Sequence, residues 1–227
     1  MLPLSPSYLT TISSGCDLYG PFWVSTTLIL ALFLSSSLAA SISKYLSAPN
    51  TQYDYNFGLL GLAATIVYAY SFGVPVALWL ALRYLGVGEW GIVDALGVWG
   101  YALFVWIPVS VGCLACVNCR STDRQQQVLC VIPESITRWV LVGVAFGLSG
   151  YYLGANVYPI LSSVSRFLIV RDPDWVDLAA LQADAKATRL LIIVVAALHA
   201  GLALTFKVLF FSYYVVRDLS AGSDPLR

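Results

Sequence analysis

The chain has 227 residues, of which 59% are hydrophobic and only 11% are charged, and its formal net charge at pH 7 is zero. Soluble domains carry roughly a quarter charged residues, so this composition excludes an ordinary water-soluble domain. A neutral chain gives no reason to expect electrostatic binding of nucleic acid or of acidic lipid, and membrane lipid is the surrounding partner that the apolar composition predicts.

The N-terminal segment, residues 1–21, contains no Lys or Arg and therefore lacks the basic region that opens a secretory signal. The apolar run that follows, 22–43, is also long for a signal sequence, so we predict that it is the first membrane span. The small residues near Ala40 leave cleavage after that residue as an alternative.

Four more segments are apolar and long enough to cross about 30 Å of hydrocarbon. They are 59–84, 94–117, 139–161 and 190–214. Gly73 and Pro75 predict a kink in the second span, and Pro108 removes a backbone donor in the third. The connections are short, so we predict an all-α polytopic membrane protein, a compact bundle of five transmembrane helices.

In this division, residues 22–216 form one five-span membrane domain and 217–227 a short C-terminal tail. The longest connection is 162–188, where Asp174 follows a proline and is a candidate N-cap. We predict an amphipathic interfacial helix from Trp175 toward Arg189. The basic residues divide between the two sides too evenly for the positive-inside rule to fix the orientation.

Three cysteines, Cys113, Cys116 and Cys119, stand close together at the end of an apolar stretch. A structural zinc site needs four nitrogen or sulfur ligands, and the single histidine of the chain is far away. We therefore expect neither a metal nor another cofactor. A disulfide that uses Cys119 or Cys130 stays possible if that loop faces an oxidising lumen.

Four glycines of the fourth span share one helical face, because their spacing is i, i+4, i+7 and i+11. They are Gly143, Gly147, Gly150 and Gly154. Two GxxxG steps of this kind allow close approach of another helix backbone. We expect them to pack within the bundle, with a dimer interface as the alternative.

The fifth span contains two polar residues, His199 and Lys207, which form a candidate intramembrane polar site. Lys207 either snorkels to the interface or is a buried cation paired with a carboxylate or a backbone carbonyl. Asp17 and Glu134 are its candidate partners. If His199 and Lys207 line one cavity, the chain is a channel, a transporter or a lipid-handling protein, which is the main alternative function.

A Gly-x-Ser-Gly string ends at Gly150 and contains Ser149, and a histidine lies on another span. This pairing resembles the nucleophile and base of rhomboid-type intramembrane serine proteases. Such short strings are common in glycine-rich helices, and the six-span rhomboid core does not match five predicted spans. Protease activity is therefore a remote alternative, and contact between Ser149 and His199 is its geometric requirement.

Three strings together resemble one family. They are DLYGPFW before the first span (Asp17, Leu18, Tyr19, Gly20, Pro21, Phe22, Trp23), GYALFVWIP in the third (100–108), and LHA with Lys207 and two phenylalanines in the fifth (198–211). In this order on five spans they are similar to the Yip family, the Ypt/Rab-GTPase-interacting membrane proteins. The resemblance extends from Asp17 to Phe211.

The resemblance implies a multi-pass protein of Golgi and ER membranes with a cytosolic N-terminus and a lumenal C-terminus. It implies vesicle-mediated transport through binding of Rab-type small GTPases and of other Yip proteins, in homo- or hetero-oligomers, without catalysis. Within DLYGPFW, the first five residues are implied as a partner-binding motif or a membrane-entrance motif. Family members carry a longer cytosolic region than residues 1–21 provide here.

Overall fold

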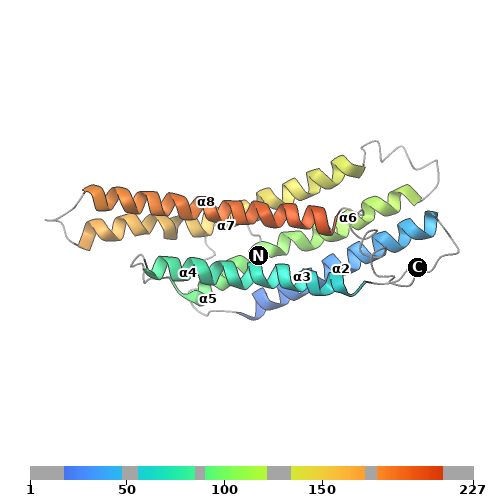
Figure 1. Ribbon diagram of the computed structural model, residues 1–227, viewed down its shortest axis with the longest axis horizontal. Helices are drawn as coiled ribbons and strands as arrows, with labels where there is room; N and C mark the ends of the chain where they lie inside the picture. Colours follow the sequence, from blue (N-terminus) through green and yellow to red (C-terminus); the bar gives the residue numbers. More distant parts are fainter. Residues whose placement is uncertain (1–17, 48–55, 85–89, 122–133, 172–177, 212–227) are drawn as a thin grey trace, which may run out of the picture.

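The computed structural model describes residues 18–47, 56–84, 90–121, 134–171 and 178–211. Each described element is helical (Figure 1). In chain order these are α2 (Tyr19–Ser47), α3 (Gly58–Tyr68), the π-helix η1 (Ala69–Gly73), α4 (Val74–Tyr84), α5 (Ile92–Ala102), the 3₁₀ turn η2 (Leu103–Val105), α6 (Trp106–Ser121), α7 (Glu134–Arg171) and α8 (Leu178–Leu209).

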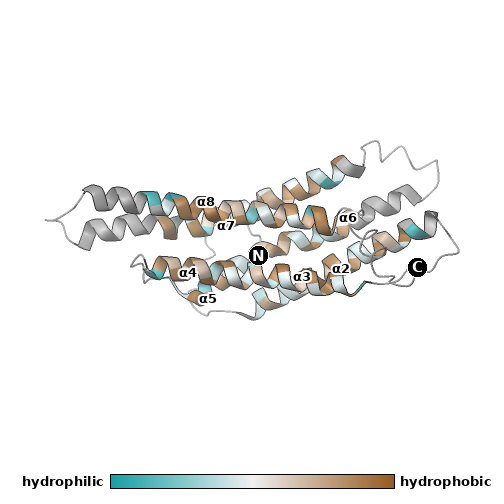
Figure 2. Ribbon diagram, viewed as in Figure 1, coloured by the Kyte–Doolittle hydropathy of each residue, from teal (hydrophilic) through white to brown (hydrophobic). Residues whose placement is uncertain are grey.

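Five stretches within these helices are long and apolar enough to cross a membrane. They are Tyr19–Ile42, Gly58–Tyr84, Ile92–Cys113, Ile136–Leu161 and Thr188–Leu209. The predicted all-α five-span bundle is thereby confirmed. Apolar residues occupy the central part of the helices and hydrophilic residues gather toward the ends (Figure 2).

Two of the spans are interrupted, and in both cases the irregular turn contains the residue four positions before a proline. Ser71 precedes Pro75 by four positions and lies in η1, and Phe104 precedes Pro108 in the same way and lies in η2. A proline ring collides with the carbonyl of residue i−4 in a regular α-helix, so the chain changes its hydrogen-bond pattern there. In η1 this buries Tyr70 and Ser71 inside the bundle.

The helix α2 is at the centre of the packing, since it contacts α3, α5 and α6. α7 packs against α8, α6 and α5, and α7 and α8 run side by side along the opposite side of the bundle from α3 and α4 (Figure 1). A single large cluster of buried apolar side chains joins these elements, with Trp99, Trp106 and Phe206 among its fully buried members.

The interfacial helix that the sequence predicts is not a separate element. Residues from Leu178 onward continue without a break into the last span as one 32-residue helix, α8. The segment before Thr188 is rich in Ala, Leu, Gln and Lys, which favour helix, and it contains no Gly or Pro to end one. Asp174 and Trp175 lie outside the described residues.

Candidate functional site

The described part of the DLYGPFW motif, from Leu18 to Trp23, has two faces at the start of α2. Tyr19 is 73% exposed, and Phe22 and Trp23 are about half exposed. The rings of Tyr19 and Phe22 each lie within 6 Å of the Trp23 ring, edge to face, and form an exposed aromatic surface. Asp17, which completes the motif, lies outside the described residues.

The other face of the motif packs against the second family string. Gly20 lies against the Tyr101 side chain so closely that a Cβ at Gly20 would collide with its hydroxyl. Reciprocally, a Cβ at Gly100 would fall within 2.7 Å of the Pro21 Cα. Two strings eighty positions apart in the sequence therefore form one contact, in which Gly100 allows backbone approach and Gly20 makes room for the Tyr101 side chain.

This contact also determines how far along the third span the start of α2 lies. Gly100 is eight residues along α5 from its start, roughly 12 Å at 1.5 Å per residue. The motif therefore lies beside the interior of the third span rather than level with its first residue. As a result, the exposed aromatic surface lies alongside membrane-spanning helices.

A second polar site lies inside the bundle. The Nε2 atom of His199 lies 2.9 Å from Oγ of Ser149, and its Nδ1 lies 2.8 Å from the Tyr70 hydroxyl. All three side chains are buried. The relay joins α7, α8 and the π-helix η1, whose irregular turn buries Tyr70.

The direction of this relay follows from the single hydrogen of a hydroxyl group. Ser149 Oγ lies 2.7 Å from the carbonyl of Ala145 and donates to it in helical geometry. With that hydrogen on the Ala145 carbonyl, the His199 tautomer that satisfies all three groups carries its proton on Nε2, donates to Ser149 and accepts from Tyr70 at Nδ1. A general base must accept the serine proton, so this arrangement is the reverse of a nucleophile–base pair.

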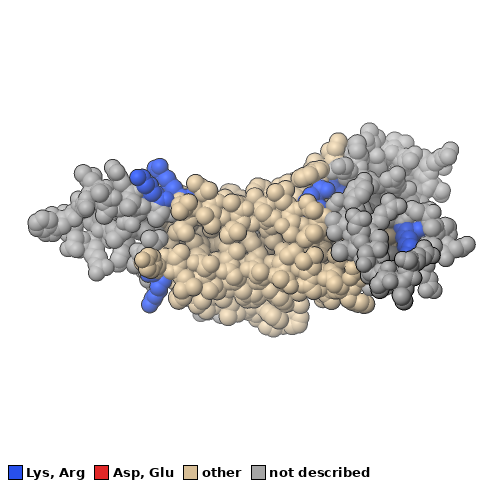
Figure 3. Space-filling view, viewed as in Figure 1, with Lys and Arg blue, Asp and Glu red and all other residues tan. Residues whose placement is uncertain are grey.

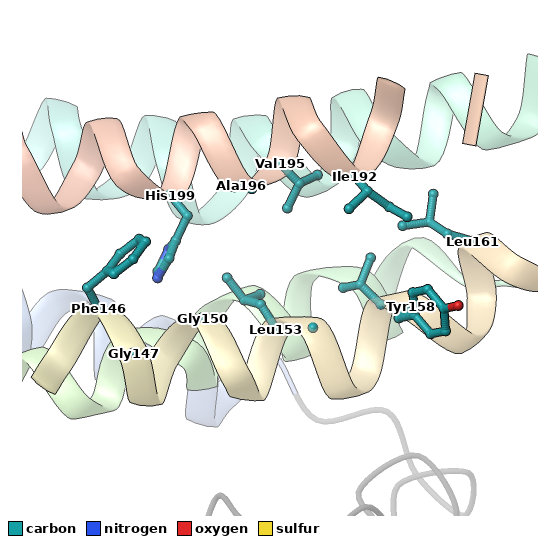
Figure 4. A pocket seen from close by; sticks show the side chains of 12 residues that line it. Phe146, Gly147, Gly150, Leu153, Tyr158, Leu161, Ile192, Val195, Ala196 and His199 are labelled. Atoms are coloured by element: carbon teal, nitrogen blue, oxygen red, sulfur yellow. The ribbon is translucent and has the colours of Figure 1, made fainter. Parts of the chain in front are cut away.

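An apolar groove lies between α7 and α8 and encloses about 360 Å³. Figure 4 shows its floor at Gly147 and Gly150, with the His199 ring at one end and Leu161 at the other. The imidazole stacks on Phe146 at a centroid distance of 5.2 Å. Both ring nitrogens of His199 are already bonded in the relay, so the lining of the groove is mainly apolar, with Tyr158 near its other end.

The glycine stripe of α7 borders this groove. Gly143, Gly147 and Gly154 have no atom of another element within 4 Å of the place a Cβ would occupy, and Gly150 faces the His199 ring at 3.5 Å. Within the described residues, the stripe is therefore open at three of its four positions. Its role in helix packing, within the bundle or at a dimer interface, stays a prediction.

His199 and Lys207 occupy separate surroundings. The Nζ atom of Lys207 lies 5.0 Å from the centre of the Trp139 ring, near the end of α8, and Lys207 does not line the groove. Of the two candidate partners, Asp17 and the side chain of Glu134 lie outside the described part. The groove that His199 borders therefore does not extend to Lys207.

Tyr70 and Arg138 are the two residues of these sites that the sequence did not single out. Tyr70 is one of several tyrosines in an apolar span. The one local signal of an irregular turn at this position is Pro75, five residues later. Arg138 directly precedes the predicted fourth span, 139–161, yet the structure buries it and its Nη1 donates to the Phe211 carbonyl at 3.3 Å.

The comparisons with known proteins agree with the three strings. The chain is similar to "Protein YIPF1 homolog" of Dictyostelium discoideum, 29% identical over 93% of this chain and 50% of that protein. It is also similar to "Protein YIP5" of Schizosaccharomyces pombe, 29% identical over 91% of this chain and 70% of that protein. "Protein YIP5" of Saccharomyces cerevisiae is 26% identical over 62% of this chain and 46% of its own length.

The chain thus spans about half the length of the Dictyostelium relative. No family model matches it, and no solved structure matches it. The similarity to the two fuller matches extends over more than nine-tenths of this chain. By sequence, the chain is a homologue of the Yip-family membrane proteins.

Proposed function

We propose that this chain is a Golgi and ER membrane protein that acts in vesicle-mediated transport by binding Rab-type GTPases and other membrane proteins of its own family. Its relatives indicate a membrane protein of the secretory pathway. The proposed orientation places the N-terminus in the cytosol and the C-terminus in the lumen. The proposal includes no catalytic step.

The observation that supports a binding function best is the two-sided motif at the start of α2. Gly20 and Pro21 fix the helix against α5, whereas Tyr19, Phe22 and Trp23 are exposed. Aromatic side chains are enriched among the residues that dominate binding energies. A rigidly seated surface of this kind is suited to a partner that approaches beside or within the membrane.

The test is a binding assay with the full chain in nanodiscs, probed with prenylated Rab-type GTPases and with purified Yip proteins. Tyr19→Ala and Trp23→Ala are the test variants. We expect each to weaken binding at least about tenfold, the size of a hot-spot contact, without a change in thermal stability. Tyr151→Ala is the control, because Tyr151 is 60% exposed on a different helix.

Binding by Tyr19→Ala and Trp23→Ala that equals that of the wild type would contradict a role for the exposed aromatic surface. Failure of the wild-type chain to bind any partner in the panel would contradict the adaptor proposal for these residues. A tagged chain that accumulated at the plasma membrane or in mitochondria would contradict the proposed location.

The protease alternative has one observation in its favour, the 2.9 Å contact between Ser149 and His199. Two features oppose it. Ser149 is fully buried and donates to its own helix, and the relay places the shared proton on the imidazole. We propose instead that the contact is structural and fixes α8 to α7.

A further inference from the structure

Lys207 is a largely buried lysine whose ammonium group lies beside an aromatic ring. Its side chain is 9% exposed, and its Nζ lies over the Trp139 ring. Among the described residues it makes no hydrogen bond and no ion pair. Cation–π contact compensates only part of the hydration that a partly buried charge loses, so an anion beside it would stabilise this group further.

A second cation lies close to it. Arg138 is 8% exposed and within electrostatic range of Lys207, and its guanidinium is oriented by its bond to the Phe211 carbonyl. Two like charges that approach one another in a low-dielectric region repel strongly. Arg138 therefore adds a second group of hydrogen-bond donors beside Lys207 at this end of the bundle.

The described carboxylates cannot supply that anion. Asp94 is the one acidic residue whose side chain the structure describes, and it opens α5. Cys113, which is within electrostatic range of Lys207, is nineteen residues further along the same span, so Asp94 lies about 28 Å away. Among the described residues, basic side chains are visible toward both ends of the uncharged band in Figure 3, and none that is acidic is visible on that face.

We propose that Lys207, with Arg138 beside it and Trp139 beneath it, binds the phosphate of a phospholipid headgroup. The site lies where α7 has just begun and α8 is about to end, the depth at which headgroups meet a bundle. A phosphate oxygen accepts from both an ammonium and a guanidinium, and tryptophan is favoured at this interface. The neutral net charge of the chain did not indicate such a local site.

The test is thermal unfolding of the full chain in a phosphate-free maltoside detergent with added dioctanoyl phosphatidylglycerol. We expect the lipid to raise the Tm by about 2–4 °C at saturation, because it binds only the folded state. Lys207→Met is expected to lose this response, and Lys207→Arg to keep it. Lys44→Met is the matched control, since Lys44 is an exposed lysine at the same end of the bundle.

Two further ligands separate the possible sources of the effect. Dioctanoylglycerol, which has no phosphate, is expected to leave the Tm unchanged. Inorganic phosphate at the same concentration is expected to have a much smaller effect than the lipid, and an equal effect would overturn the assignment to a lipid. An undiminished lipid response in Lys207→Met would overturn the site itself.

The lipid-free proteins provide an independent readout. If Lys207 has no anion in the chain, Lys207→Met removes an uncompensated charge and should unfold at the same or a higher temperature than the wild type. If Lys207→Met and Glu134→Gln both lower the Tm and their effects are coupled, the anion is Glu134 and the proposal is wrong.

Discussion

Ser149 and His199, fifty positions apart in the chain, lie 2.9 Å apart inside the bundle. Tyr70 completes the relay from the second span. α8 packs mainly on α7. Two further contacts join α8 to other helices: His199 bonds to Tyr70 of η1, and the Phe206 ring lies edge to face with Trp106 of α6 at a centroid distance of 5.1 Å. A polar relay of this kind fixes the rotation of α8, which apolar contacts alone leave loosely specified.

Removal of the serine hydroxyl should therefore destabilise the bundle. We expect Ser149→Ala to lower the free energy of unfolding by about 1 kcal/mol, typical of a hydrogen bond between spans. Thr205→Val is the control, because the exposed Thr205 hydroxyl bonds only to Gly201 of its own helix. The measurement is unfolding in mixed micelles, and a double-mutant cycle with His199→Phe should show coupling; strictly additive effects would argue against the relay.

Ser149 should not react with an activity-based fluorophosphonate probe. Its oxygen is buried and its proton is donated to Ala145, so the imidazole does not activate it. The measurement is probe labelling of the intact protein in nanodiscs. Labelling that disappears in Ser149→Ala but persists in Ser110→Ala, whose hydroxyl is equally buried and helix-bonded, would restore the hydrolase alternative.

Gly100→Ala should destabilise the contact between the two family strings. The new methyl group would overlap Pro21, and overpacking of this kind typically costs about 1–3 kcal/mol. Thermal unfolding in detergent measures the loss. Gly61→Ala is the control, because a Cβ at Gly61 meets nothing within 4 Å, and a comparable loss in both variants would contradict the specific contact.

Gly147→Ala should leave the isolated chain as stable as the wild type or stabilise it by up to about 1 kcal/mol, because alanine favours helix and the site is open. If the stripe contacts a second copy or another membrane protein, the same change weakens that association, which cross-linking in nanodiscs measures. A clear loss of stability in the separated chain would instead show that the stripe packs within the bundle.

The sequence predicted the spans well because each one is a local property. About twenty apolar residues must form a helix in a bilayer, where every backbone group needs an internal partner. The helix predicted from Trp175 toward Arg189 is helical from Leu178 onward, but it is not a separate element. Amphipathic patterning identified helical residues before Arg189, but it could not show that they continue without a break into α8.

The sites depended on tertiary structure. The motif around Gly20 was visible as a string, yet its two faces exist only because Tyr101 and Gly100 approach from another span. Likewise, no local pattern pairs Ser149 with His199 or buries Tyr70 in a π-helical turn. Hydropathy determines that a helix crosses the membrane, whereas its rotation and depth depend on side-chain contacts between helices, and those contacts decide which polar residues meet.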